Sequence, residues 1–313
     1  MTKISDKDQP ILVTGAHRSG TTWVGKMLSA SDQVAYISEP LNVYHRPGIL
    51  RAPVTHWYTY ICEKNEEQYL PALRETTHFK YHTWREIKSL RSAKDAARMG
   101  RDWSSFALAR LRHQRPLLKD PFAVFSIPWF SLRLGCQVIV LVRHPAAFAS
   151  SLKRLDWSFD FQDLLTQRLL MHDWLEPFRG EMEAMLKTPD DVIDQSNLLW
   201  RMIYHVVAAY RETDPDLQWV RHEDLSRDPL GGYGCIYTNL DLEFTPQAQQ
   251  VVLESSSAAN PGELPIQTVH ATRVDSRANI DNWRHRLSAD EIKRIRQQTN
   301  DVATLYYSEQ DWE

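Results

Sequence analysis

The chain has 313 residues, of which 42% are hydrophobic and 25% are charged. These fractions are ordinary for a globular enzyme and unlike those of a disordered chain. The 37 basic residues stand against 40 acidic ones, which gives a net charge of −3. A slightly negative chain gives no support for nucleic-acid binding, so any site for an anionic ligand must be local.

The cysteines Cys62, Cys136 and Cys235 lie far apart and form no CxxC pair, which predicts reduced thiols in a reducing compartment. The first ten residues are polar, and no stretch approaches the ~18 apolar residues of a membrane span. With the initiating Met, these features predict a cytoplasmic protein of bacterial type without stable membrane insertion. No His, Cys and carboxylate cluster has metal-ligand spacing, so we expect no metal. Homo-oligomerisation is left open.

The first elements in the chain predict an anion site. Residues 10–14 read as a short buried strand, residues 15–20 as a glycine-bounded loop, and residues 21–30 as a helix. Backbone N–H groups at a helix start point outward, and the helix dipole favours negative charge there. Residues 34–37 predict a second strand, which ends just before Glu39.

Residues 42–115 predict a largely helical insertion, with helices near 66–75 and 89–111. The segment is rich in Tyr, His, Trp and Arg, which suits a region that binds an acceptor substrate. A plain helical cap over the sheet is an equal alternative.

Beyond the insertion, strands and helices alternate. Strands are predicted at 117–120, 137–142 and 217–220, and helices at 122–134, from Pro145 onward, and at 197–211, 246–255 and 288–298. Ser288 and Glu291 form a capping box for the last helix. This alternation predicts an α/β fold: a single domain over residues 1–313 with a central, mainly parallel sheet flanked by helices.

The loop after the first strand reads Gly15-Ala-His-Arg-Ser-Gly-Thr-Thr-Trp23. A nucleoside-triphosphate loop needs GxxxxGK[ST], but Thr21 stands where that Lys belongs, and the cation is Arg18 inside the loop. This disfavours a P-loop kinase or NTPase. What remains is a cradle of backbone N–H groups, two hydroxyls and one guanidinium, which suits a group less charged than a γ-phosphate. A tight structural turn without a ligand is the alternative.

The RSGTTW segment resembles the 5′-phosphosulfate loop of sulfotransferases that use 3′-phosphoadenosine 5′-phosphosulfate (PAPS), and the overall pattern is nearest to the carbohydrate sulfotransferases. The resemblance implies a P-loop-containing domain that binds PAPS and releases the product PAP without a metal. It assigns the loop residues to the phosphosulfate group: His17, Arg18, Ser19, Gly20, Thr21 and Thr22. It also implies that Trp23 stacks on adenine, with simple helix packing as the alternative.

Three downstream segments extend the resemblance. Arg143, at a strand end, and Ser151, eight residues later, resemble the family's 3′-phosphate motif. His222 stands in Arg221-His-Glu-Asp-Leu, where cytosolic members often have Tyr against the adenine. Arg277 keeps the basic character of the family's segment that closes over the 3′-phosphate.

The general base is expected to be Glu39, because Ser38-Glu-Pro-Leu-Asn42 resembles an acidic segment that follows the phosphate loop in some carbohydrate sulfotransferases. Asp120, at another strand end, is the alternative, and His17 and His45 remain open. By the same resemblance, Lys119 stabilises the transferring sulfuryl oxygens; a solvated strand-end Lys would explain it equally.

The resemblance implies that the chain transfers a sulfuryl group from PAPS to a hydroxyl of a carbohydrate or glycoconjugate. Aromatic faces can stack on sugars and Arg can engage anionic groups on them. The insertion offers such residues: Tyr44, Trp57, Tyr58, Trp84, Arg85 and Trp103. Each aromatic taken singly fits a structural core as well, and a lipid or peptidyl tyrosine acceptor stays open. A non-catalytic PAP-binding protein is a further alternative.

Overall fold

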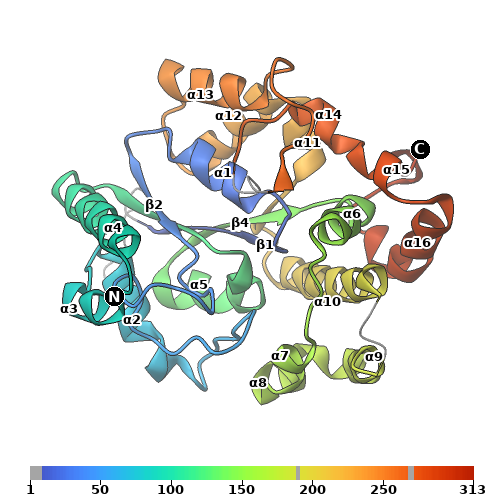
Figure 1. Ribbon diagram of the computed structural model, residues 1–313, viewed down its shortest axis with the longest axis horizontal. Helices are drawn as coiled ribbons and strands as arrows, with labels where there is room; N and C mark the ends of the chain where they lie inside the picture. The colour runs from blue at the N-terminus through green and yellow to red at the C-terminus, as the bar shows by residue number, and fades with distance from the viewer. Residues whose placement is uncertain (1–8, 188–190, 267–270) are drawn as a thin grey trace.

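The computed structural model describes residues 9–187, 191–266 and 271–313; the polar residues 1–8 lie outside these ranges. Its centre is a sheet of five parallel strands (Figure 1). In sheet order these are β2 (Val34–Ser38), β3 (Arg115–Lys119), β1 (Ile11–Gly15), β4 (Gln137–Val142) and β5 (Gln218–Arg221). The predicted α/β fold with a parallel sheet is therefore confirmed.

Side chains alternate between the two faces of the sheet along each strand, so both faces are apolar and helices cover both. Ile11 and Val13 pack under four helices on one face: α1 (Thr21–Leu28), α11 (His222–Arg227), α12 (Pro229–Asn239) and α13 (Pro246–Ser256). Leu12 points to the other face, where α5 (Ile127–Leu134), α6 (Pro145–Leu155) and α10 (Val192–Thr213) lie. On that side, α16 (Ala289–Ala303) packs against α6 and α10.

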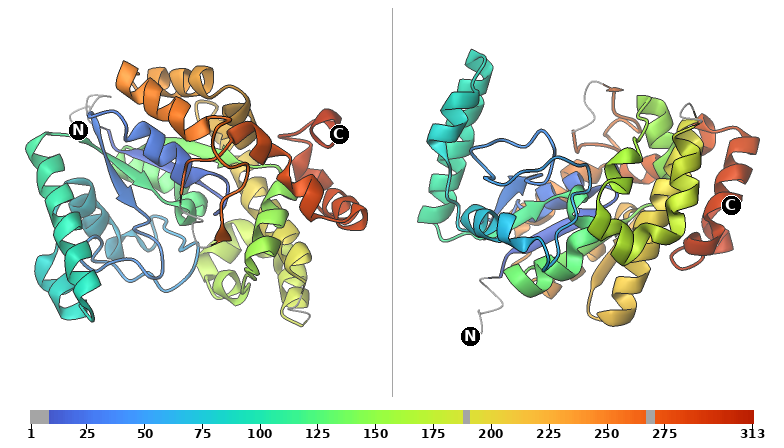
Figure 2. Two further views of the ribbon diagram at one scale, coloured as in Figure 1. Left: turned by 45° about the horizontal axis from the view of Figure 1, so that its top comes forward. Right: turned by 90° about the horizontal axis from the view of Figure 1, so that it is seen from below.

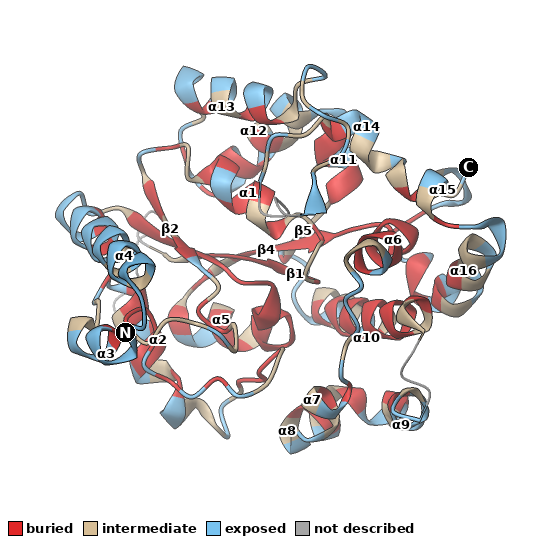
Figure 3. Ribbon diagram, in the orientation of Figure 1, coloured by how far each residue is buried: buried red, intermediate tan, exposed pale blue. Residues whose placement is uncertain are grey.

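The insertion forms η2 (Glu66–Gln68), α2 (Leu70–Thr77), α3 (Thr83–Ser89) and α4 (Ala93–Leu111). Of the 19 residues of α4, only Phe106 and Ala109 are buried, and the helix is almost wholly pale blue in Figure 3. Figure 2 shows α4 and α16 at opposite ends of the molecule. The insertion ends one residue earlier than predicted, because Arg115 already pairs with β2 as the first residue of β3.

Other boundaries also differ from the prediction. The expected helix over residues 122–134 is a 3₁₀ segment, η3 (Pro121–Ser126), followed by α5, since Asp120 caps the first turn and Pro128 opens the second helix. The short helices over residues 162–185 and 276–286 were not predicted. They are α7 (Gln162–Leu165), α8 (Arg168–Leu170), the π turn η4 (Met171–Leu175), η5 (Glu176–Phe178), α9 (Arg179–Met185), α14 (Ser276–Ile280) and α15 (Asn282–Arg286); η7 (Glu309–Asp311) ends the chain. The capping box of Ser288 and Glu291 is confirmed.

All five strands end at the same edge of the sheet, since they are parallel. The glycine loop after β1, Glu39 after β2, Lys119 at the end of β3, Arg143 after β4 and His222 after β5 therefore gather there. Ligands of open parallel sheets bind at this carboxyl edge. Among the described helices, none has the length and apolar character needed to cross a bilayer.

Candidate functional site

The loop after β1 can only be built with glycine at both ends. Gly15 has φ +140°, and a Cβ there would lie 2.3 Å from the Leu141 carbonyl oxygen. Gly20 has φ +99°, and a Cβ there would lie 2.6 Å from Nδ1 of His222. Gly20 precedes α1 without a side-chain cap, so the first N–H groups of this eight-residue helix remain for an anion.

Two arginines flank the loop. The Arg143 guanidinium donates from Nη1 to the Arg18 carbonyl oxygen at 2.8 Å, and Nε of Arg18 donates to the Ser151 hydroxyl at 3.1 Å. Nε of Arg143 is buried and has no hydrogen-bond partner among the described residues. Burial of a cation is costly unless an anion or acceptor satisfies it, so this orphaned donor fits a phosphate group.

The cationic cluster is larger than the sequence indicated. Burial, followed by the nearby charges of Arg143, Arg154 and Arg286, lowers the pKa of Arg18 to about 10. Arg154 and Arg286 share one carboxylate, that of Glu263. Sequence reasoning missed both. Arg154 had a usable signal, because it follows Ser151 by three residues and so lies on the same face of α6.

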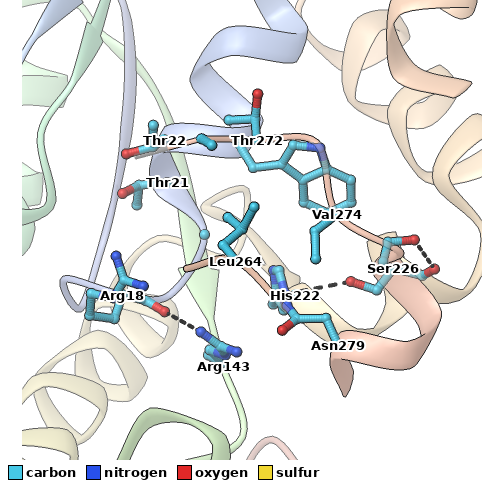
Figure 4. A pocket seen from close by; sticks show the side chains of 14 residues that line it. Arg18, Thr21, Thr22, Arg143, His222, Ser226, Leu264, Thr272, Val274 and Asn279 are labelled. Carbon is cyan, nitrogen blue, oxygen red and sulfur yellow. Dashed lines mark hydrogen bonds between the residues drawn. The ribbon is translucent and has the colours of Figure 1, made fainter. Parts of the chain in front are cut away.

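A pocket of about 120 Å³ lies beside the loop. Its lining includes Trp23 and, labelled in Figure 4, Arg18, Thr21, Thr22, Arg143 and His222. Known ligand pockets measure roughly 300–1,000 Å³. Leu264 also lines this pocket. The residues fit an anionic nucleotide: backbone donors, an orphaned guanidinium and an aromatic wall.

Trp23 and His222 line the pocket and also contact neighbouring residues of the fold. The Trp23 indole donates to the Ser255 hydroxyl at 3.0 Å and packs edge-on against Tyr233. Burial, then the charge of Arg143, lowers the pKa of His222 to about 3, so this imidazole is neutral. Arg277, in contrast, donates to the Arg227 carbonyl oxygen at 2.8 and 3.1 Å. It does not line the pocket, whereas its neighbours Ser276 and Asn279 do.

A second cavity of about 640 Å³ opens on the other side of the loop. Its wall contains Glu39, the aromatic side chains of Tyr44, Trp57 and Tyr58 from the insertion, and Phe122. The segment after α6 completes it with Asp156, Trp157, Phe159, Asp160 and Asp163, none of which was singled out from the sequence. The expected acceptor residues Trp84, Arg85 and Trp103 do not line it: they lie on the exposed faces of α3 and α4.

The two cavities meet at the phosphate loop. Arg18, Thr21 and Thr22 line both of them. A group bound to the nucleotide side at these three residues is therefore within reach of a ligand in the second cavity.

Glu39 and Asp120 occupy different environments. Glu39 lines the second cavity, forms an ion pair with Lys119, and accepts a hydrogen bond from the Asn42 amide at 2.7 Å. Asp120 is 1% exposed and lines neither cavity; its two oxygens accept the N–H groups of Leu41 and Phe122. Burial is the main reason why the pKa of Asp120 is raised to about 7. Its position thus favours a structural role and leaves Glu39 as the accessible carboxylate.

Lys119 is buried, with its ammonium group directed at Glu39. It lines neither cavity. A positive charge beside Glu39 favours the ionised carboxylate, which is the form that accepts a proton. The structure thus ties Lys119 to Glu39, and its predicted contact with sulfuryl oxygens stays a prediction.

His17 lies in the phosphate loop and lines the second cavity, with its Nδ1 2.6 Å from the Tyr58 hydroxyl. His45 does not line either cavity; its Nδ1 lies 3.0 Å from the Asn42 carbonyl oxygen. Within the described parts of the chain, no group of three or more His, Cys, Asp and Glu residues could hold a metal ion.

A parallel sheet with a glycine-bounded loop, two arginines and an aromatic pocket at its carboxyl edge defines an α/β protein with a site suited to an anionic ligand. A profile of the Sulfotransferase family matches residues 10–246. The chain therefore belongs to the sulfotransferase family.

Two curated relatives are named carbohydrate sulfotransferase 5. The mouse protein is 24% identical over 92% of this chain and 77% of its own length, and the human protein is 22% identical over 92% and 74%. Among solved structures, a sulfotransferase domain from the curacin biosynthetic pathway has a TM-score of 0.49 at 16% identity, covering 93% of this chain and 97% of that one. A sulfotransferase domain from the Synechococcus PCC 7002 olefin synthase has a TM-score of 0.49 at 19% identity, covering 96% and 95%.

Proposed function

We propose that this sulfotransferase takes its sulfuryl group from PAPS and transfers it to a hydroxyl of a carbohydrate or glycoconjugate. The observation that carries the proposal is the junction of the two cavities at Arg18, Thr21 and Thr22. The phosphate loop suits the 5′-phosphosulfate, and the orphaned Nε of Arg143 suits the 3′-phosphate. Ser151 supports this arrangement through its hydrogen bond to Arg18.

We infer that the reaction is an in-line displacement, which these positions support. The acceptor oxygen loses its proton to Glu39 and forms a bond to sulfur, while the bond between sulfur and the 5′-phosphate oxygen breaks. The leaving phosphate carries the released electron pair, and Arg18 with the backbone N–H groups of Gly20 to Thr22 stabilises that charge. A positioned base contributes ~10²–10⁴-fold in rate.

The carbohydrate acceptor is supported by the aromatic walls of the second cavity and by the names of the curated relatives. Aromatic rings present apolar faces on which a sugar ring can stack, and carboxylates at the rim can accept hydrogen bonds from sugar hydroxyls. Arg85, the arginine expected to engage anionic groups on a sugar, lies outside this cavity.

Transfer of ³⁵S from labelled PAPS to a panel of neutral oligosaccharides, lipids and tyrosine peptides tests the proposal. We expect label on a saccharide, no dependence on added Mg²⁺ and no inhibition by chelators. Label on a peptide or lipid alone would replace the carbohydrate part of the proposal. Tight PAP binding without label on any panel member would favour the non-catalytic alternative, and ATP–Mg²⁺ turnover would favour a kinase.

A further inference from the structure

The buried Tyr58 and the partly exposed His17 form a pair at the wall of the second cavity, called the acceptor cavity below. Tyr58 comes from the insertion and is 0% exposed, with its ring among Phe122, Phe125 and Phe159. Its φ of +56° lies in the left-handed region, which bulky residues rarely adopt unless the surroundings fix them there. The fold thus holds this hydroxyl in place beside the phosphate loop.

The hydrogen bonds around the Tyr58 oxygen determine where its proton lies. The backbone N–H of His17 donates to this oxygen at 3.2 Å, and Nδ1 of the same histidine lies 2.6 Å away. Burial raises the pKa of Tyr58 well above its ordinary value, so the phenol keeps its proton. Among the described residues no other acceptor is within hydrogen-bond distance of this oxygen. The phenol must therefore donate to Nδ1, because a buried donor without an acceptor is unfavourable.

A neutral imidazole that accepts at Nδ1 carries its proton on Nε2. Neutrality follows from the surroundings of His17, which packs against the rings of Phe122, Phe148 and Trp157. Burial and the charge of Arg18 lower the pKa of His17 to about 4, against a smaller opposite effect of Glu39. No hydrogen bond to a described residue uses Nε2, and the side chain lines the acceptor cavity.

We propose that Tyr58 is a positioning residue that fixes His17 as the Nε2–H tautomer, so that His17 donates a hydrogen bond to the attacking acceptor oxygen. The lone pair of His17 is occupied by the Tyr58 proton, so His17 does not act as the base. Proton removal falls to Glu39 on the same cavity wall. This inference rests on the proposed function for its role in turnover, but the tautomer itself is independent of any substrate.

The tautomer can be measured directly. In protein labelled with ¹⁵N-histidine, the nitrogen chemical shifts distinguish protonated from unprotonated ring nitrogens, and His17→Gln identifies the signals of His17. We expect a protonated Nε2, an unprotonated Nδ1, and no titration of this ring between pH 7 and 5. A protonated Nδ1, or titration near the ordinary value of about 6.5, overturns the proposal.

Tyr58→Phe and Tyr204→Phe form a matched pair of variants. Tyr204 also accepts a loop N–H, that of Ala16 at 3.4 Å, but its hydroxyl donates to the Leu141 carbonyl oxygen. We expect Tyr58→Phe to mix the two tautomers of His17, and Tyr204→Phe to leave the tautomer unchanged. An unchanged tautomer in folded Tyr58→Phe overturns the role of Tyr58; if that variant does not fold, the wild-type spectrum still decides the tautomer.

Turnover supplies the second readout. We expect Tyr58→Phe to lower kcat roughly tenfold, with PAP affinity unchanged. Full kcat in Tyr58→Phe contradicts the positioning role. Failure of the wild-type protein to bind PAP would instead contradict the proposed function. The tautomer measurement does not depend on that result.

Discussion

The pocket beside the phosphate loop, called the nucleotide pocket below, and the acceptor cavity share Arg18, Thr21 and Thr22 but differ in their other walls. The nucleotide pocket is completed by Arg143 after β4 and by residues 222–226, 264 and 271–279. The acceptor cavity is completed by residues 39–44, 57–58, 121–122 and 156–163. Backbone recognition of a phosphate needs a contiguous loop with glycines, whereas side-chain recognition of an acceptor needs only proximity in space.

The two regions also differ in charge. Arg18, Arg143 and the neighbouring Arg154 and Arg286 surround the nucleotide side. The acceptor cavity carries Asp156, Asp160 and Asp163 at its wall. The positive charge of the arginines suits the phosphates. The negative charge of the three aspartates disfavours acceptors that bear sulfate or carboxylate groups near the reactive hydroxyl.

The largest expected effect is the loss of kcat on replacement of Glu39. Glu39→Gln keeps the shape and the hydrogen-bonding capacity but removes the base, so kcat should fall ~10²–10⁴-fold. PAP affinity, measured by calorimetry, should stay unchanged, because Glu39 lines only the acceptor cavity. Glu254→Gln, at a carboxylate outside both cavities, is the control. Full activity of Glu39→Gln would remove Glu39 from the mechanism.

Acid should destabilise the fold through two buried histidines. Burial lowers the pKa of His144 and of His222 to about 3, below the ordinary value of about 6.5. The unfolded chain then binds more protons below about pH 6.5, so stability is complete above that pH and is lost as the pH falls toward 3. Each group contributes up to about 5 kcal/mol.

The pH dependence can be traced to one side chain. His144 packs between Trp283, Tyr307 and Trp312, and neither ring nitrogen has a partner among the described residues. Urea unfolding of His144→Phe should therefore show a flatter decline in stability between pH 6.5 and 4. The exposed His172→Phe should keep the wild-type slope; equal slopes for wild type and His144→Phe would refute the assignment.

Two arginine variants test which arginine binds the 3′-phosphate. Arg143→Ala should weaken PAP binding by about 1.5–3 kcal/mol, or roughly 10–150-fold, because a charged hydrogen bond to phosphate is lost. Arg277→Ala should have little effect, since that guanidinium engages the Arg227 carbonyl oxygen. Calorimetry with PAP gives both values. The reverse order of effects would mean that Arg277, and not Arg143, binds the 3′-phosphate.

The smallest effect concerns acceptor charge. Asp160→Asn removes one negative charge from the cavity wall, which should improve kcat/KM for anionic saccharides by roughly 2–5-fold relative to neutral ones. Asp290→Asn, on exposed α16, is the matched control. A loss of activity with anionic acceptors would show that Asp160 does not repel such acceptors.

The sequence predicted the elements that follow from local chemistry. The apolar runs of β1 and β4, the glycine-bounded loop and the capping box of α16 are each encoded in consecutive residues, so the sheet and the nucleotide side could be anticipated. Glu39 was singled out because residues 38–42 resemble an acidic segment of some carbohydrate sulfotransferases, and its role as the base stays a prediction.

The rest depends on tertiary contacts. Residues 156–163 line the acceptor cavity only because α6 ends beside it, and no local sequence pattern predicts that position. Asp120 and Glu39 look alike in the sequence, but only the fold buries Asp120 under two backbone N–H groups. Whether Arg277 points to a pocket or to a carbonyl oxygen is likewise decided by where α11 places Arg227.

Calorimetric titration with PAP, alongside adenosine 5′-monophosphate and ATP–Mg²⁺, tests the central claim most directly. A pocket that uses Arg143 to bind a 3′-phosphate should bind PAP with micromolar or tighter affinity and adenosine 5′-monophosphate much more weakly. Preference for ATP–Mg²⁺, or no binding of PAP, would contradict the nucleotide assignment on which the proposed sulfuryl transfer depends.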